Sequence, residues 1–247
     1  MPIMIIALLT ITVVGTSFLS GIFGMAGGLI LIGILLALLP VADAMALHAV
    51  TQLASNGWRA ASWIRHVRWG PVASYAGGCA LAMVGWSIVR FVPERGEAML
   101  MLGLSPLLVR LLPARFAPDA EKPAHGVIFG VICMSLMLLT GVSGPLLDRF
   151  FLGGKLERRQ IVASKAIAQT MGHAAKWLYF GGLVADTGSV DPLMAGLAIL
   201  ASMVGTMAAR PVLEAMTDVN YRRWAGWIIT TISLYFVLHG AWLIINR

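Results

Sequence analysis

The stretch of sequence that decides the fold is a glycine-rich interruption between two apolar runs, Ser20-Gly21-Ile22-Phe23-Gly24-Met25-Ala26-Gly27-Gly28. A second interruption, Thr140-Gly141-Val142-Ser143-Gly144-Pro145, lies in the other half of the chain. The apolar runs that follow, Leu29 to Leu39 and Pro145 to Leu152, are too short to cross a hydrocarbon core of about 30 Å, which needs roughly 20 helical residues. Irregular backbone at membrane depth is tolerated only where it is buried in protein or lines a cavity. Each interruption therefore predicts a broken, re-entrant helix hairpin.

The composition indicates an integral membrane protein. Of the 247 residues, 59% are hydrophobic and 12% are charged, whereas a soluble domain has about 25% charged residues. The net charge of +7 is therefore read by position along the spans, and we expect no nucleic-acid partner. Cys79 and Cys133 lie in apolar runs without metal-ligand spacing, so neither a metal nor a cofactor is expected. Arg59 is the first basic residue, so the N-terminal run is expected to belong to the fold and not to a signal peptide.

Basic residues predict how the spans are oriented. Twelve lysines and arginines lie in the segments 65–68, 110–122, 149–159 and 210–223, and only Arg90, Arg95 and Arg247 lie in the opposite loops. Because basic residues mark the cytoplasmic ends of membrane spans, the four segments are expected inside and both termini outside. Each hairpin is then followed by three full spans, and the two halves have opposite topology.

The sequence thus predicts an all-α integral membrane protein of two inverted-topology repeats, each a broken re-entrant helix hairpin followed by three transmembrane helices. The first repeat is predicted at 1–112, a cytoplasmic linker at 113–124 and the second repeat at 125–247. Two internal matches support the duplication: Leu19-Ser20-Gly21 with Leu139-Thr140-Gly141, and Arg59-Ala60-Ala61-Ser62-Trp63 with His173-Ala174-Ala175-Lys176-Trp177. Broken helices in inverted repeats are typical of secondary transporters, which bind their substrate near the midplane.

Three cations, Arg59, Lys165 and Lys176, remain inside the predicted spans, and all carboxylates are expected in loops or at helix ends. A buried cation is costly unless it is paired or solvated, so a bound anion would be an economical partner. Arg59 and Lys176 have an alternative, because a long side chain near a helix end can reach the membrane interface. Any proton dependence is expected to run through His173, since no carboxylate is expected within the spans.

Two polar stripes carry these cations. Residues on the first stripe recur at steps of 4, 4 and 3, and the second stripe repeats those steps: His48, Gln52, Asn56 and Arg59, then Lys165, Gln169, His173 and Lys176. Such spacing places each set on one helix face, and the repetition favours a shared cavity over separate hydrogen bonding between helices.

The starts of the two second limbs, expected at Gly27-Gly28 and at Pro145, would direct unsatisfied N–H groups toward the midplane, where glycine lets a ligand approach closely. Stripes and interruptions together predict one anion-binding site. Its predicted residues are Ser20, Gly21, Gly24, Gly27, Gly28, Gln52, Asn56, Arg59, Thr140, Gly141, Ser143, Gly144, Lys165, Gln169 and His173.

The run from Leu19 to Ile30, followed by Ala49-Val50-Thr51 and His66-Val67-Arg68-Trp69-Gly70, resembles the sulfite exporter TauE/SafE family, also called the 4-toluene sulfonate uptake permeases. In the second half, Thr140-Gly141-Val142-Ser143-Gly144, Ala163-Ser164-Lys165 and the segment from Gly205 to Arg210 are similar to the family's second repeat. The resemblance implies a secondary transporter of the bacterial inner membrane that moves a sulfonate such as 4-toluenesulfonate, or sulfite. Its partners would be this small anion and the lipid bilayer.

The chain departs from the family pattern at the expected site. Ala26 stands where the family usually has another glycine, Gln52 stands where serine is common, and the second interruption is shorter. Aromatic side chains near the stripes would suit an aromatic sulfonate, although tryptophan near a helix end is ordinarily an interfacial anchor. These residues are Phe23, Trp58, Trp63 and Trp177.

Two other functions fit parts of the sequence. An anion channel would also use a cationic site at the midplane. An intramembrane serine protease would use Ser143 of Gly141-Val142-Ser143-Gly144 with His173, provided that the two side chains form a hydrogen bond. The protease interpretation leaves the first interruption and the paired stripes without a role, so the chain is not expected to be an enzyme.

Overall fold

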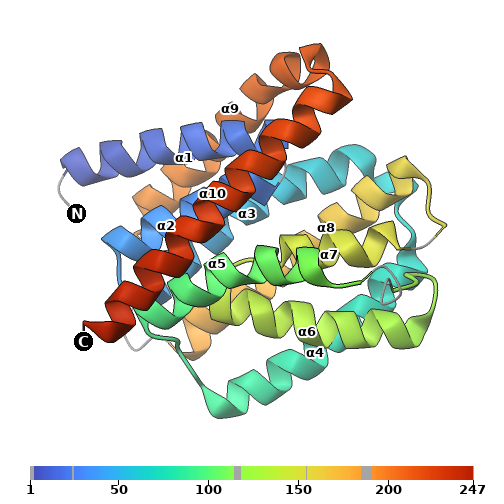
Figure 1. Cartoon of the computed structure of the whole chain (residues 1–247), viewed down its shortest axis with the longest axis horizontal. Coiled ribbons are helices and arrows are strands. Elements are labelled where there is room, and N and C mark those ends of the chain that lie inside the picture. The colour runs from blue at the N-terminus through green and yellow to red at the C-terminus, as the bar shows by residue number, and fades with distance from the viewer. Residues whose placement is uncertain (1–2, 24, 114–117, 154, 185–190, 247) are drawn as a thin grey trace.

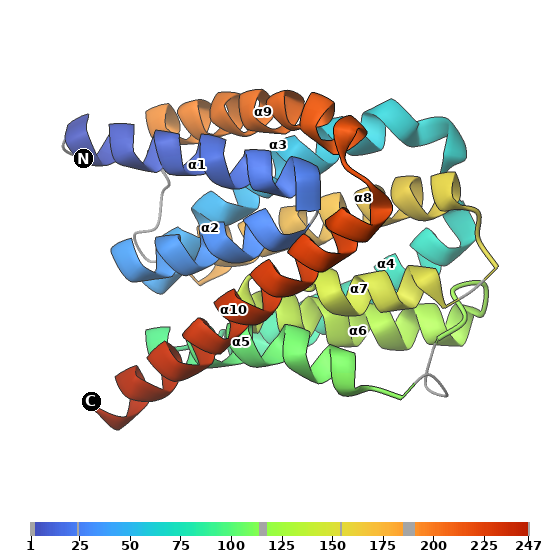
Figure 2. The same ribbon diagram turned by 45° about the horizontal axis from the view of Figure 1, so that its top comes forward.

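The structure is a computed structural model that describes residues 3–23, 25–113, 118–153, 155–184 and 191–246. Over these residues the chain forms helices and no strand, so the predicted all-α class is confirmed. Figures 1 and 2 show the helices packed as one bundle, with both chain ends on the same side.

The helices of the first half begin and end where local sequence favours it. A reciprocal capping box between Glu94 and Glu97 starts the last of them, and Arg90, with a left-handed φ of 51°, ends the one before. The helices are α1 (Ile3–Phe23), α2 (Met25–Leu38), α3 (Val41–Trp63), the 3-10 turn η1 (Ile64–His66), α4 (Trp69–Val89) and α5 (Arg95–Leu111).

The second half follows the same local rules. Pro123 occupies the first turn of its first helix, which ends at Gly141 with a φ of 85°, and Glu157 forms a capping box with Gln160. The helices are α6 (Pro123–Thr140), α7 (Gly144–Leu152), α8 (Arg158–Leu178), the π-helical turn η3 (Tyr179–Leu183), α9 (Pro192–Ala215) and α10 (Asp218–Ile245).

Length and apolar content distinguish three kinds of helix. Among the described residues, five helices are long and apolar enough to cross a membrane: α1, α4, α6, α9 and α10. The second limbs α2 and α7 have only 14 and 9 residues, as predicted from the short apolar runs. With 23 and 21 residues, α3 and α8 are long enough to span but carry the polar stripes, which lower their apolar content.

The helices pack in pairs that follow the predicted duplication. In Figure 1, α1 lies beside α9 and α4 beside α6, while α5 packs against α10 and α3 against α8. If residues 125–247 repeat residues 1–112, the pairs α1–α9 and α6–α4 are equivalent, and α3–α8 and α5–α10 each join two equivalent helices. An internal twofold axis would produce this pairing. The duplication itself stays a prediction.

Small residues allow the closest of these contacts. A Cβ atom added to Gly78 of α4 would lie 2.1 Å from the Val127 carbonyl oxygen of α6, and one added to Gly205 of α9 would lie 2.3 Å from the Val14 carbonyl oxygen of α1. In lipid there is no hydrophobic driving force between helices, so their association depends on close backbone packing through small residues.

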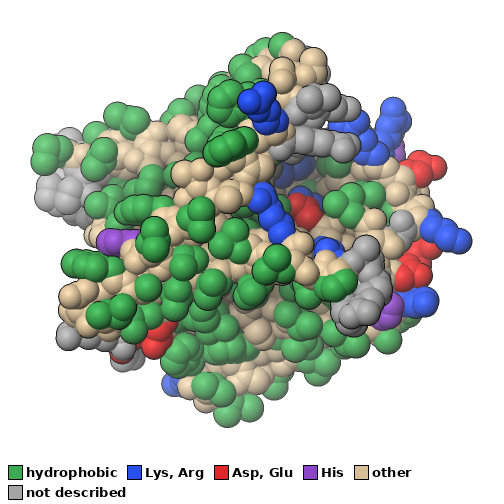
Figure 3. All heavy atoms as spheres, in the orientation of Figure 1, with side chains coloured by type: hydrophobic (Ala, Val, Ile, Leu, Met, Phe, Trp, Pro, Cys, Tyr) green, Lys and Arg blue, Asp and Glu red, His purple; other side chains and the backbone are tan. Residues whose placement is uncertain are grey.

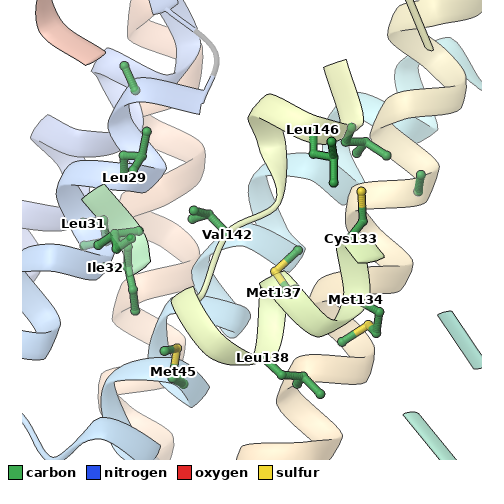
Figure 4. Close-up of a cluster of buried hydrophobic side chains, with 14 of the residues drawn as sticks. Leu29, Leu31, Ile32, Met45, Cys133, Met134, Met137, Leu138, Val142 and Leu146 are labelled. Atoms are coloured by element: carbon green, nitrogen blue, oxygen red, sulfur yellow. The ribbon is translucent and has the colours of Figure 1, made fainter. Parts of the chain in front are cut away.

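A cluster of buried apolar side chains joins the two halves beside the second break. Figure 4 shows Val142 pointing from this break toward α2, where Leu29 and Ile32 are almost fully buried. Met137 and Leu138 of α6 belong to the same cluster. The second break is therefore enclosed by protein on this side, as irregular backbone in a membrane must be.

Charged side chains gather at one end of the bundle. Figure 3 shows a largely hydrophobic surface, with most basic and acidic groups at the right-hand end. The turn between α3 and α4 lies at that end, opposite the termini, as do residues 118–122 before α6 and residues 155–157 before α8 (Figure 2). Arg68 of the first turn pairs with Glu121 of the second segment at 3.7 Å.

This arrangement leads to a topology prediction. We expect Asn246→Cys to react with a membrane-impermeant maleimide in intact cells and Glu121→Cys to react only after permeabilisation, because basic residues are retained in the cytoplasm. Both positions are exposed, whereas the native Cys79 and Cys133 are buried and should add little background. Labelling of Glu121→Cys from outside would show that the orientation is the opposite of the predicted one.

Candidate functional site

The two polar stripes meet where α3 packs against α8. Side chains from both stripes surround one cavity with a volume of about 20 Å³, room for about one water molecule. Three residues of the first stripe and two of the second line it, whereas His48, His173 and Lys176 do not. Its lining residues are Ser20, Met25, Gln52, Ser55, Asn56, Arg59, Lys165 and Gln169.

A ladder of hydrogen bonds orders the α3 side of the cavity. Arg59 Nη1 donates to Asn56 Oδ1 at 3.3 Å, and Asn56 Nδ2 donates to Gln52 Oε1 at 3.2 Å. Residues three or four apart are neighbours on a helix, so the spacing of the stripe produces the ladder directly. The ladder and the cavity lining show that Arg59 faces the cavity and does not extend to the membrane interface.

The first break is shorter than predicted. Gly21 lies within α1, and Gly27 and Gly28 lie within α2, which begins at Met25, not at Gly27. Gly24 lies outside the described residues. The expected start of the second limb at Gly27-Gly28 is wrong because these glycines serve helix packing. A Cβ atom at Gly21 would lie 2.4 Å from Ala209 Cβ, and one at Gly27 would lie 1.9 Å from the Thr16 carbonyl oxygen.

The second break is a true interruption of the helix. Gly141 adopts the left-handed conformation, and Thr140 Oγ1 donates to the Val142 carbonyl oxygen at 2.8 Å. α7 begins at Gly144, one residue earlier than predicted, where a Cβ atom would lie 3.1 Å from Met25 Cβ. The first residues of α2 and α7 therefore lie side by side, and two helix N-termini meet near the cavity.

A buried chain of hydrogen bonds links the second break to α2. Lys176 Nζ donates to the Gly141 carbonyl oxygen at 2.9 Å and lies 2.7 Å from His48 Nδ1. His48 Nε2 lies 3.1 Å from the Gly28 carbonyl oxygen, which can only accept, so Nε2 carries the proton. In the neutral tautomer Nδ1 then accepts from Lys176. Lys176 and His48 are fully buried, so Lys176 does not extend to the interface.

Two buried polar atoms beside this chain make no hydrogen bond. They are Ser143 Oγ and His173 Nδ1, on side chains that are 1% and 3% exposed. The His173 ring lies 5.5 Å from the His48 ring, centroid to centroid. The hydrogen bond between Ser143 and His173 that a serine protease requires is thus missing in this structure.

One expectation about charge is wrong. Asp148 of α7 forms an ion pair with Lys165, and the two side chains are only 26% and 22% exposed. A carboxylate therefore does lie beside the cavity, because α7 is short and its second turn packs along the start of α8. The premise that assigned any proton dependence to His173 alone therefore does not hold.

The aromatic side chains do not support a large aromatic substrate. Trp58, Trp63 and Trp177 are 53%, 38% and 44% exposed, and none of them lines the cavity. Exposed tryptophans on membrane helices are expected to contact lipid or the interface. Phe23 is buried but does not line the cavity either.

Sequence reasoning overlooked some residues of the site. Ser55 could have been found, because it lies three positions after Gln52 and four before Arg59 and so shares their face. Asp148 lies four positions after Gly144, one helical turn into α7, but its partner on α8 depends on tertiary packing. Met25 gave no signal other than its place beside the interruption.

Comparison with known proteins identifies the family. The family model described as sulfite exporter TauE/SafE matches residues 8–236, which include both breaks and both polar stripes. The chain belongs to the sulfite exporter TauE/SafE family. A comparison with curated proteins and one with solved structures gave no match.

Membership of the TauE/SafE family fixes the broad function. The protein is a multi-pass membrane transporter of sulfur-containing anions, consistent with a chain that is not an enzyme. The resemblance seen in the sequence is confirmed, and the family's description names export, not uptake.

The Lys176 chain generates a stability prediction. We expect His48→Leu to lower the free energy of unfolding in detergent or nanodiscs by about 1–3 kcal/mol, because it leaves the buried Lys176 with one acceptor fewer. Adding Lys176→Met should restore part of the loss, because the buried cation is then removed as well. His239→Leu is the control, since His239 stacks on Tyr235 and Trp242 of its own helix. If His48→Leu alone were as stable as the wild type, the hydrogen bonds of Lys176 and His48 would not stabilise the fold.

Proposed function

We propose that the protein moves a small sulfur oxyanion across the membrane by alternating access, and that the anion binds in the cavity between α3 and α8. One observation carries this proposal: the stripes bring Arg59 and Lys165 from the two halves of the chain to one cavity within the membrane-embedded part of the fold. Two cationic side chains at one cavity can donate charge-assisted hydrogen bonds to an anion that enters it.

The surroundings of the cavity favour an oxyanion. Ser20, Asn56 and Gln169 supply hydroxyl and amide groups, and the cavity adjoins Met25, the first residue of α2. Free N–H groups at a helix start bind oxyanions well, and the helix dipole adds to the attraction. The adjacent start of α7 contributes in the same direction.

Ser143 and His173 extend the predicted site toward the second break. Ser143 precedes Asp148 at the start of α7, and His173 lies between Lys165 and Lys176 on α8, which packs against α7. Each carries a buried polar atom without a partner, and such atoms are rare in proteins unless a ligand or water completes them. An anion that moves along α8 would find its next hydrogen bonds here.

The size of the cavity favours a small substrate. A volume of about 20 Å³ is less than an oxyanion needs, so long side chains such as Lys165 must move as the anion enters. Since Trp58, Trp63 and Trp177 are exposed and do not line the cavity, sulfite or a short alkanesulfonate fits better than 4-toluenesulfonate. The family's description, which names sulfite, agrees with this choice.

The proposed mechanism is that of a carrier in the bacterial inner membrane. The helix pairing supports two inverted repeats, and rocking of one repeat against the other would expose the cavity to each side in turn. An anion channel remains the alternative function, because it would use the same cationic cavity. The two mechanisms differ in how substrate on the far side affects the rate.

The experiment uses proteoliposomes and radiolabelled sulfite. A carrier should accumulate label faster when the vesicles contain unlabelled sulfite, and a channel should not. Lys165→Met should weaken the apparent affinity roughly ten- to a hundredfold, the cost of one charge-assisted hydrogen bond. Lys122→Met, an exposed position outside the cavity, is the matched control. Unchanged affinity in folded Lys165→Met would remove this cavity from the proposal.

A further inference from the structure

Among the described side chains at the site, Asp148 is the one that works against an anion. Its carboxylate pairs with Lys165, and Lys165 also lines the cavity, whereas Asp148 does not. An anion that binds Lys165 must therefore share the ammonium group with a fixed negative charge of the protein. Since the two side chains are about three-quarters buried, solvent screens this charge incompletely.

The repulsion from Asp148 depends on the charge of the ligand. Coulomb energy scales with the product of the charges, so a dianion at a given position is repelled twice as strongly as a monoanion. Attraction to Arg59 and Lys165 scales in the same way, and Asp148 subtracts from that attraction. The carboxylate thus removes much of the advantage that a second negative charge would otherwise have.

Desolvation then favours the monoanion. A dianion gives up considerably more hydration than a monoanion on entering a small cavity, and only strong net attraction offsets that loss. Because Lys165 is already paired with Asp148, the cavity has less attraction to offer.

We propose that Asp148 sets the charge class of the substrate, so that the site takes monoanionic sulfur oxyanions, which are sulfonates and hydrogensulfite, in preference to dianions such as sulfate. This inference rests on the proposed binding of anions in the cavity. It makes Asp148 a specificity-determining residue that acts through Lys165. A purely structural role, in which the carboxylate only stabilises Lys165, would change the binding of all anions by a similar factor.

The experiment compares two probes of similar tetrahedral shape whose charges are fixed near neutral pH: methanesulfonate, a monoanion, and sulfate, a dianion. Dissociation constants are measured in nanodiscs by calorimetry for the wild type, Asp148→Asn and Asp148→Glu. The wild type should bind methanesulfonate at least tenfold more tightly than sulfate. In Asp148→Asn the ratio of the two constants should shift toward sulfate by roughly tenfold, while Asp148→Glu should keep the wild-type ratio.

Glu121→Gln is the matched control, because Glu121 also pairs with a cation but lies at the exposed end of the bundle. Its ratio should equal that of the wild type. An unchanged ratio in Asp148→Asn, or a wild type that binds sulfate as tightly as methanesulfonate, would overturn the inference. The wild-type comparison stands even if Asp148→Asn does not fold. A wild type that binds neither probe would instead count against the proposed function.

Discussion

The structure depends on how Lys176 is accommodated. A fully buried lysine in a membrane protein must find acceptors, and the second break supplies one in the Gly141 carbonyl, 2.9 Å from Nζ. A backbone carbonyl freed by a broken helix in turn needs a donor, because lipid provides none. The hydrogen bond between Lys176 and the Gly141 carbonyl therefore satisfies both groups at once. His48 extends the contact to Gly28 of the first half, so that one hydrogen-bonded chain joins α2, α3, the second break and α8.

The cavity follows from this connection. Once the second break is held against α2, the first residues of α2 and α7 lie side by side. The remaining polar residues of α3 and α8 line one cavity, about one to three helical turns from His48 and Lys176. Arg59 and Lys165 are thereby brought to one place from sequence positions in opposite halves. Asp148 reaches the same place because α7 is short and ends beside the start of α8.

Much of this could be predicted from the sequence, and the rest could not for a definite reason. Periodicity identifies which face of a helix is polar, so the stripes from His48 to Arg59 and from Lys165 to Lys176 were found. It does not identify the partner of that face, so the ion pair with Asp148 was missed and the burial of Lys176 was left open. Glycine clusters mark a close approach of some kind, but only packing shows that Gly21 and Gly27 receive neighbouring helices. The family resemblance was reliable because it combined several motifs in order along the chain.

The most direct test of the account is to locate a bound anion. Crystals grown with bromomethanesulfonate would give an anomalous bromine signal that marks the ligand independently of model building. The account predicts one strong peak between α3 and α8, within contact distance of Asn56, Arg59 and Lys165. A peak at the cytoplasmic surface, with the cavity between the two stripes unoccupied, would contradict it.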